Sequence, residues 1–343
     1  MRCLTLAQYL RLKSIESSFI CRELPGHLMD MVRDEGFEVI ALPAPAKKPD
    51  QPLGCGYLAW LGVPIATDAA ETVQILKKRS QPRLVVDSYA LDVEWENEVR
   101  ACITRLMVID DLANRPHNCD ILLDQNYSPS GDRYNGLVPP HCVKFMGPQW
   151  ALLREQFYRV PSRSRTRDGS IRRLLVFLGA IDSNNGTEKA LQAIRSLNRP
   201  DITVDVVVGQ KNLFKNQVRE LVKGMKNAVY HEQISNMAEI LGGCDLAIGS
   251  GGTHTWERCF MGVPAIVGIL AENQRELVEN LAATGAIWNA GWWKEIRSDA
   301  LAQLLRIVLE EPTLVKAASI KGQEIMGFRD QSGLQGLIDA IIA

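Results

Sequence analysis

The chain has 343 residues, which is long enough for two domains that each bury a full hydrophobic core. Its 39 Lys and Arg residues balance 40 Asp and Glu residues, so the charge indicates neither a nucleic-acid partner nor an anionic membrane surface. No apolar run approaches the length of a membrane span and no signal peptide is visible at the start, which together predict a cytoplasmic protein.

The first residues are predicted to form a helix that is already under way. Leu4, Leu6, Ala7 and Leu10 recur at helical spacing, and no Ser, Thr, Asp or Asn precedes them as a cap. No strand precedes this helix in the sequence either. The chain therefore begins within a unit of secondary structure.

Short apolar runs then alternate with helical stretches over most of the length. The predicted strands of the first half are 17–24, 37–43, 83–89, 105–112, 120–126 and 143–148, and those of the second half are 172–179, 203–209, 244–250, 263–269 and 286–290. Strands separated by helices imply parallel sheets built from right-handed crossover units. The fold class predicted is therefore α/β, with two Rossmann-like domains.

The basic, polar stretch 157–170 carries Pro and Gly and is predicted to link the two domains. The expected domains are therefore 1–156 and 171–343. Ligands of such sheets collect where loops leave the carboxyl ends of the strands.

The loop in "GSGGTHTWERCF" (249–260) is the strongest candidate for chemistry. Gly251 and Gly252 would let the backbone approach an anion, and the amides of a helix start would point at it. Thr253 could cap that helix, and Glu257, about one turn further along, could reach the two hydroxyls of a ribose. The alternative is a capped helix with a glycine turn and a surface glutamate.

Three other strand-end loops carry polar or small side chains. Gly179 would allow close approach of a ligand, and Asp182 would either cap the next helix or hold a ligand hydroxyl. Tyr89 ends a buried strand and either faces a ligand or is a core tyrosine with a satisfied hydroxyl. Asn273 and Gln274 follow the strand at 263–269. No Ser-His-Asp order, HExxH, Walker loop or GxGxxG occurs in the sequence.

Eight cysteines are scattered along the chain, and none of them forms a CxxC pair. A chain of this size does not need disulfides, so we expect reduced thiols. His117 with Cys119, and His141 with Cys142, lack the spacing of zinc ligands. We therefore predict loop residues at these positions and no bound metal.

Taken together, these stretches resemble a known family. "FICRELPGHL", "VVDSYALDVEWE", "IDDLANRPHNCDILLDQNY", "GPQWALLREQF", "FLGAIDSNN", "SNMAEILGGCDLAIGSGGTHTWERCFMGVPAI" and "ENQ" occur in the order found in the UDP-2,4-diacetamido-2,4,6-trideoxy-β-L-altropyranose hydrolases of pseudaminic acid biosynthesis. The family has the two-domain glycosyltransferase-B fold, also seen in the UDP-N-acetylglucosamine transferase of peptidoglycan synthesis. The resemblance covers nearly the whole chain.

The resemblance implies a role for each matching residue. It implies that UDP is bound by Gly179, Asp182, Gly251, Gly252, Thr253, Glu257 and Gln274, and that Tyr89 and Asn273 act in catalysis on the sugar. Ser88 stands where the family has His, and Ala180 stands where a second Gly is usual. The first departure would alter contacts to the sugar.

The family also offers an explanation for the helix at the start. There, "MRC" follows a turn of the form "GxGHxMRC", which the first strand precedes. By this resemblance, the general-base histidine and the first strand of the N-terminal domain lie upstream of Met1 and are absent from this chain. A misassigned start codon or a real N-terminal loss would both explain this. His254 is the only histidine in the candidate loops, and we predict a helix-start residue there and not a substitute base.

The implied reaction is attack of water on the anomeric carbon of the UDP-sugar, giving the free sugar and UDP. The glycine loop would hold the charge that develops on the departing diphosphate, and no cofactor is expected. Two alternatives remain open at this point: a UDP-sugar glycosyltransferase, and a UDP-sugar binder without catalysis. The expected partner is the UDP-sugar alone, with no nucleic acid and no membrane, on a monomeric protein.

Overall fold

A computed structural model describes residues 1–45, 56–161, 165–327 and 330–343. The chain divides into two compact units. The first unit comprises Met1–Asn126, Ser130–Leu152 and Ser332–Ala343, and the second comprises Tyr127–Pro129 and Leu153–Gln331. Each unit is described below by itself.

The first unit contains two separate parallel sheets. Strands β1 (Ser18–Arg22) and β2 (Glu38–Leu42) form one of them. The other has the order β3 (Arg83–Val86), β4 (Arg105–Ile109), β5 (Ile121–Asp124) and β6 (Val143–Met146). In the described part of the chain, β1 pairs only with β2, and β3 pairs only with β4. The parallel strands of the first unit are thus divided between two sheets in the described residues.

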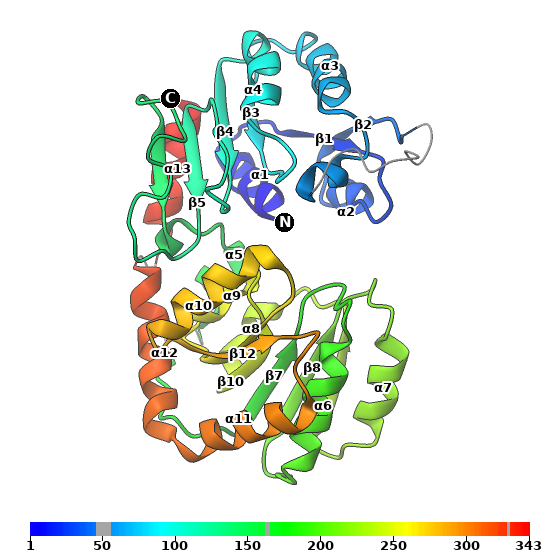
Figure 1. Cartoon of the computed structure of the whole chain (residues 1–343), viewed down its shortest axis with the longest axis vertical. Helices are drawn as coiled ribbons and strands as arrows, with labels where there is room; N and C mark the ends of the chain where they lie inside the picture. The colour runs from blue at the N-terminus through cyan, green and yellow to red at the C-terminus, as the bar shows by residue number, and fades with distance from the viewer. Residues whose placement is uncertain (46–55, 162–164, 328–329) are drawn as a thin grey trace. The chain divides into compact units, whose positions relative to one another are not determined.

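Apolar side chains of the first unit form two clusters, and Figure 1 labels its helices. These helices are α1 (Arg2–Leu12), α2 (Met29–Asp34), α3 (Ile65–Leu76), α4 (Val93–Val99) and α13 (Ser332–Ile342), with a short 3-10 turn η1 at Gly56–Leu61. The smaller cluster joins Leu4 of α1 to Val32 and Phe37. The larger one packs Trp95 of α4 against Leu106 of β4. Strand β1 takes part in both clusters, because Phe19 packs against the smaller one and Ile20 against the larger one.

The second unit has one continuous six-stranded parallel sheet, in the order β12-β11-β10-β7-β8-β9. Its strands are β7 (Arg173–Phe177), β8 (Thr203–Val208), β9 (Ala228–Glu232), β10 (Leu246–Ser250), β11 (Ala265–Ile269) and β12 (Ile287–Trp292). Both β10 and β11 are buried along their whole length. The runs of Val, Ile, Leu and Ala that predict them are typical of parallel strands covered on both faces.

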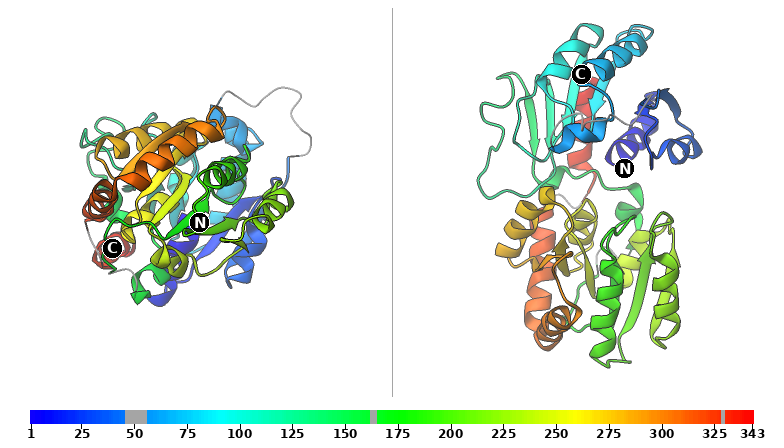
Figure 2. Two further views of the ribbon diagram at one scale, coloured as in Figure 1. Left: turned by 90° about the horizontal axis from the view of Figure 1, so that it is seen from below. Right: turned by 45° about the vertical axis from the view of Figure 1, so that its right-hand side comes forward.

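Seven main helices surround this sheet (Figures 1 and 2). They are α6 (Gly186–Ser196), α7 (Lys215–Lys223), α8 (Met237–Gly243), α9 (His254–Phe260), α10 (Arg275–Ala283), α11 (Ser298–Glu310) and α12 (Pro312–Met326). Helix α11 packs beside α6, and α12 packs beside α9. The core includes Ala190 of α6, Leu305 of α11 and Val206 of β8. None of the helices in the described residues is both long and apolar enough to cross a membrane.

The predicted linker 157–170 differs from what the structure shows. Helix α5 (Glu155–Arg159) and the residues from 165 onward belong to the second unit. There Arg167 is buried and donates to three backbone carbonyls of that unit. Residues 162–164 of the predicted linker lie outside the described residues. Two arginines of this stretch, Arg165 and Arg167, thus bind the backbone of the second unit.

The predicted end of the second domain at residue 343 also differs, because α13 clusters with the first unit. Arg83 and Arg105, at the starts of β3 and β4, donate to the carbonyl oxygens of Ile342 and Ala340. Orphan carbonyls at a helix C-terminus accept such bonds readily. The sequence also missed β9, whose polar and half-exposed residues do not form an apolar run.

Candidate functional site

The loop between β10 and α9 lies against α10, the next helix along the chain after α9. A Cβ on Gly251 would come within 2.5 Å of the Val278 side chain of α10, so a larger residue would displace the loop. Thr253 precedes α9 and is exposed, and its side chain makes no capping hydrogen bond. The cap that the sequence suggests for Thr253 is therefore not formed. The backbone amides of the first turn of α9 therefore donate no hydrogen bond to the Thr253 side chain.

Glu257 lies on the first turns of α9 and is held by an arginine. Its Oε1 accepts hydrogen bonds from Arg154 NH2 at 2.9 Å and Nε at 3.2 Å. Its Oε2 lies 3.5 Å from His254 Nε2. Burial raises the pKa of Glu257, and the Arg154 guanidinium opposes that rise. The carboxylate is thus oriented through one oxygen, which leaves the second directed at His254.

The loop after β7 combines an open glycine with a buried cap. Gly179 has a φ of +100°, and a Cβ there would meet nothing within 4 Å, so space beside it is open. Asp182 is buried and accepts from Gly186 N at 2.8 Å, Thr187 N at 2.9 Å and Thr187 Oγ1 at 2.6 Å. The structure therefore shows Asp182 capping α6. A contact from Asp182 to a ligand would require one of these bonds to give way.

The loop after β11 adjoins the glycine turn. Asn273 and Gln274 lie in a short 3-10 turn, η5 (Glu272–Gln274), and Gln274 Oε1 accepts from Leu270 N at 3.1 Å. The Gln274 side chain passes 3.9 Å from where a Cβ on Gly252 would lie. Ser250 Oγ donates to Leu178 O at 3.4 Å and so links the glycine turn to the loop after β7. The three predicted loops of the second unit are therefore neighbours at one sheet edge.

Tyr89, in the first unit, is fixed by charged residues that sequence reasoning missed. Its hydroxyl donates to Asp111 Oδ1 at 2.6 Å. Arg2 donates to Asp111 Oδ2 at 2.9 Å and to Asp87 Oδ1 at 2.6 Å. Both aspartates lie in the last three residues of the predicted strands 83–89 and 105–112, so the strand-end argument that selected Tyr89 could also have found them.

Aromatic side chains extend this group of residues. The rings of Tyr57 and Tyr89 have centroids 5.1 Å apart, and the Trp60 ring lies 6.2 Å from Tyr89. Trp60 is 61% exposed, which is unusual for so large an apolar side chain. The flat faces of such rings suit the C–H faces of a sugar. Ser88, where the family has His, accepts the Ala90 amide at 3.3 Å through its Oγ and supports the turn.

The first unit also contains a buried network of polar side chains. His117 Nδ1 lies 2.6 Å from Glu96 Oε1, and Asp110 accepts from Tyr134 OH at 2.7 Å and pairs with Arg115 at 2.8 Å. Burial disfavours the charged imidazole, but the carboxylates of Glu96, bonded at 2.6 Å, and of Asp110, 3.8 Å from Nε2, prevail and raise the pKa of His117 to about 9. The predicted loop residue His117 is thus part of the interior. No cluster that could hold a metal ion occurs among the described residues.

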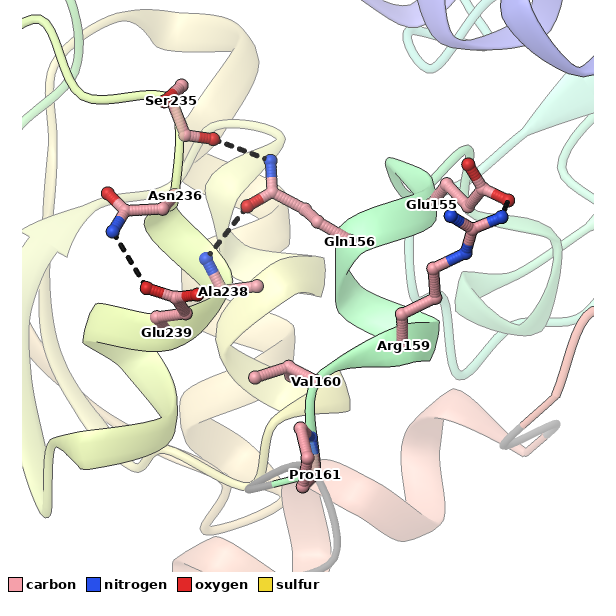
Figure 3. A pocket seen from close by; sticks show the side chains of 9 residues that line it. All are labelled: Glu155, Gln156, Arg159, Val160, Pro161, Ser235, Asn236, Ala238 and Glu239. Carbon is pink, nitrogen blue, oxygen red and sulfur yellow. Dashed lines mark hydrogen bonds and ion pairs between the residues drawn. The ribbon is translucent and has the colours of Figure 1, made fainter.

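A hollow of about 440 Å³ lies elsewhere in the second unit, between α5 and the start of α8 (Figure 3). Gln156 bridges it by donating to Ser235 O at 2.9 Å and accepting from Ala238 N at 3.2 Å. None of the residues that the sequence predicts for the site lines this hollow. Its contacts instead anchor α5 to the second unit.

Comparisons with known proteins agree with this organisation. The chain is 22% identical to an uncharacterised protein of Methanocaldococcus jannaschii over 301 residues, which is 81% of the chain and 54% of that protein. It is 26% identical to the UDP-2,4-diacetamido-2,4,6-trideoxy-beta-L-altropyranose hydrolase of Campylobacter jejuni over 49% of the chain and 60% of the hydrolase. It is 27% identical to the spore coat polysaccharide biosynthesis protein SpsG of Bacillus subtilis over 49% of the chain and 50% of that protein. The chain thus spans little more than half the length of these relatives, and no family model matches it.

Solved structures resemble the chain over nearly its whole length. MurG of Acinetobacter baumannii superimposes with a TM-score of 0.66 and 14% identity, covering 99% of this chain and 95% of MurG. Arabidopsis thaliana UGT89C1 also gives 0.66 with 14% identity, covering 100% and 96%. The chain therefore has the glycosyltransferase-B fold, and its curated relatives include a UDP-sugar hydrolase and a polysaccharide biosynthesis protein.

Proposed function

We propose that the chain acts on a nucleotide sugar and that its second unit binds the UDP part. The observation that carries this proposal is the convergence of three strand-end loops at one edge of the β7-β10-β11 sheet, with a glycine turn beside Glu257. Backbone amides at a helix start and open glycines suit a diphosphate. A carboxylate within one turn of that site suits the two hydroxyls of a ribose.

Each predicted residue has a role in this proposal. Gly251, Gly252 and Thr253 would face the diphosphate, and Glu257 would accept from the ribose through Oε2, the oxygen that Arg154 leaves open. Gly179, Asp182 and Gln274 would line the same edge of the sheet. Tyr89, supported by Asp111, would act on the sugar, and Asn273 would do so from the second unit.

The reaction we propose is hydrolysis of UDP-2,4-diacetamido-2,4,6-trideoxy-β-L-altrose to the free sugar and UDP, as in pseudaminic acid biosynthesis. Water attacks the anomeric carbon, the bond from that carbon to the diphosphate oxygen breaks, and UDP leaves. Fixed amide dipoles stabilise the negative charge on the leaving group without reorganising. The similarity to the Campylobacter jejuni hydrolase supports this reaction.

The test is to incubate the chain with this UDP-sugar in the absence of any acceptor and to quantify UDP and free sugar chromatographically. Hydrolysis predicts that both products accumulate in equal amounts. Accumulation of UDP only when an acceptor alcohol is added would identify a glycosyltransferase. Binding of UDP without release of either product would identify a binder and would contradict the proposed reaction.

A further inference from the structure

Two arginines are buried at opposite ends of strand β10. Arg167 donates to the carbonyls of Leu241 and Cys244 at the amino end, and to the carbonyl of Met261. Arg258 donates from NH2 to Ser250 O and to Thr255 Oγ1, both at 2.9 Å, at the carboxyl end. Their exposed fractions are 3% and 1%. Two buried guanidinium groups thus lie next to the same strand, one near each end of β10.

The two guanidinium groups differ in how well they are satisfied. All three nitrogens of Arg167 donate to backbone carbonyls. Arg258 Nε is buried without a hydrogen-bond partner, and NH1 reaches only His254 Nδ1 at 3.5 Å. In the part of the chain that the structure describes, no carboxylate forms an ion pair with Arg258. A buried charge without a counter-ion is costly and calls for an explanation.

The position of Arg258 supplies that explanation. A Cβ on Gly249 would lie 2.3 Å from Arg258 NH1, so the guanidinium occupies the space directly beside the end of β10. Its acceptor Ser250 O belongs to the residue that opens the glycine turn. The unpaired positive charge therefore lies behind the loop where the proposed diphosphate would sit.

His254 connects this charge to Glu257. An arginine only donates, so the hydrogen bond from Arg258 requires His254 Nδ1 to be the acceptor and places the proton of a neutral ring on Nε2. Burial, reinforced by Arg258 and Arg154, lowers the pKa of His254 well below its usual value and keeps the ring neutral. Its Nε2 faces Glu257 Oε2 at 3.5 Å. His254 Nε2 is buried and forms no hydrogen bond at this distance, so the tautomer fixed by Arg258 places an unused donor beside Oε2 of Glu257.

We infer that Arg258 is a positioning residue that supplies the buried positive charge for an anionic diphosphate at residues 250–253 and orients Glu257 through His254. This inference rests on the proposed function and extends it, because it identifies an electrostatic requirement for the diphosphate part of the ligand. It predicts that Arg258 matters for the charged part of the nucleotide and much less for the neutral nucleoside.

The test compares Arg258→Met with Arg167→Met by calorimetric titration of UDP, uridine and inorganic pyrophosphate. A buried unit charge close to a phosphate is expected to change affinity by about tenfold or more. Arg258→Met should therefore weaken UDP and pyrophosphate binding about tenfold more than it weakens uridine binding. Arg167→Met should lower the urea midpoint but leave the ratio of UDP to uridine affinity unchanged.

Arg258→Lys keeps the charge but loses the planar fork, and it serves if Arg258→Met does not fold. It should retain most of the preference for UDP over uridine. Equal losses of UDP and uridine affinity in Arg258→Met, or a Lys variant that loses the preference despite folding, would overturn the inference.

Pyrophosphate separates the two proposals. If the wild type binds pyrophosphate but not UDP, and Arg258→Met loses that binding, the result supports the role of Arg258 and contradicts the proposed function. Binding of neither ligand by the wild type contradicts both.

Discussion

In the second unit, β10 and β11 are buried from end to end, and the buried arginines lie at the ends of β10. In the first unit, β1 and β2 are half-exposed along most of their length, and buried ion pairs join neighbouring elements. Strands β10 and β11 of the second unit are thus stabilised mainly by apolar burial, and the carboxylates of Asp205 and Asp245 form ion pairs with arginines at the other end of the same sheet. In the first unit, the polar side chains near Tyr89 also hold the structure together, so changes there combine effects on stability and on function.

The largest effect expected from this difference is at Arg22 in β1. Its guanidinium pairs with Asp68 of α3 at 2.6 Å, and Asp68 also accepts from Trp95 Nε1 at 3.0 Å. Removing one partner of a buried pair leaves an uncompensated charge, so Arg22→Met should destabilise the first unit by about 3–5 kcal/mol. Urea unfolding, monitored in each unit by hydrogen exchange, would measure this loss of stability.

Arg79→Met is the matched control, because Arg79 pairs with Glu38 of β2 on the surface. That change should alter the free energy of unfolding by less than about 1 kcal/mol. If both variants destabilise the first unit equally, or if Arg22→Met destabilises only the second unit, the contrast between the units is wrong.

The next effect concerns pH. Burial opposes charging of His117, yet the nearby carboxylates of Asp110 and Glu96 raise its pKa to about 9. A raised pKa contributes stability that is fully present below the unfolded pKa of about 6.5 and is lost as pH rises through 9. The first unit should therefore lose about 3 kcal/mol of stability between these pH values. Burial raises the pKa of Asp124 to about 7, so the stability that depends on protonated Asp124 is lost at lower pH, between about 4 and 7.

His117→Gln should flatten the dependence of the urea midpoint on pH above 6.5. His141→Gln should leave that dependence in place, because the His141 side chain is exposed. An unchanged slope in His117→Gln would show that the buried network does not govern the stability of the first unit.

A smaller effect is expected on ligand affinity in the second unit. Glu257→Ala should weaken UDP binding by about 1.5–3 kcal/mol, the range for hydrogen bonds to a charged group. Calorimetric titration would measure it, with Glu279→Ala on the exposed side of α10 as control. Unchanged affinity for UDP in Glu257→Ala would remove this residue from the site.

The smallest effects are expected at the sugar. Tyr89→Phe removes the bond to Asp111, and Asn273→Ala removes an amide at the end of β11. Each should reduce turnover by about two- to tenfold, corresponding to the loss of one neutral hydrogen bond to the sugar of about 0.5–1.5 kcal/mol, while the dissociation constant of UDP stays nearly constant. Loss of UDP binding in a folded Tyr89→Phe variant would contradict the proposed role of Tyr89 at the sugar.

Most of the fold follows from local pattern. Apolar runs such as 105–112 and 263–269 match β4 and β11, because strands buried on both faces need an unbroken apolar sequence. The edge strand β9 was missed, since its outward side chains are polar. The return of α13 to the first unit was missed as well, because it depends on long-range bonds from Arg83 and Arg105 that no local pattern records.

The candidate site was predictable in part for the same reason. Gly251, Gly252 and Gln274 could be selected as strand-end residues, and the structure brings them together. The roles of Arg258 and Arg2 could not be predicted, because each looks like an ordinary helical arginine in the sequence. Only tertiary packing buries the first and pairs the second with Asp87 and Asp111.

The central claim is that UDP binds at the strand-end loops of the second unit, and hydrogen exchange with and without saturating UDP tests it most directly. The account predicts slower exchange in peptides that cover residues 249–260 and 270–275, where the glycine turn, α9 and η5 lie. Peptides that cover residues 83–92 of the first unit should change little, because UDP lacks the second sugar on which Tyr89 is proposed to act. Absence of protection in the second unit, or protection confined to the first unit, would contradict the account.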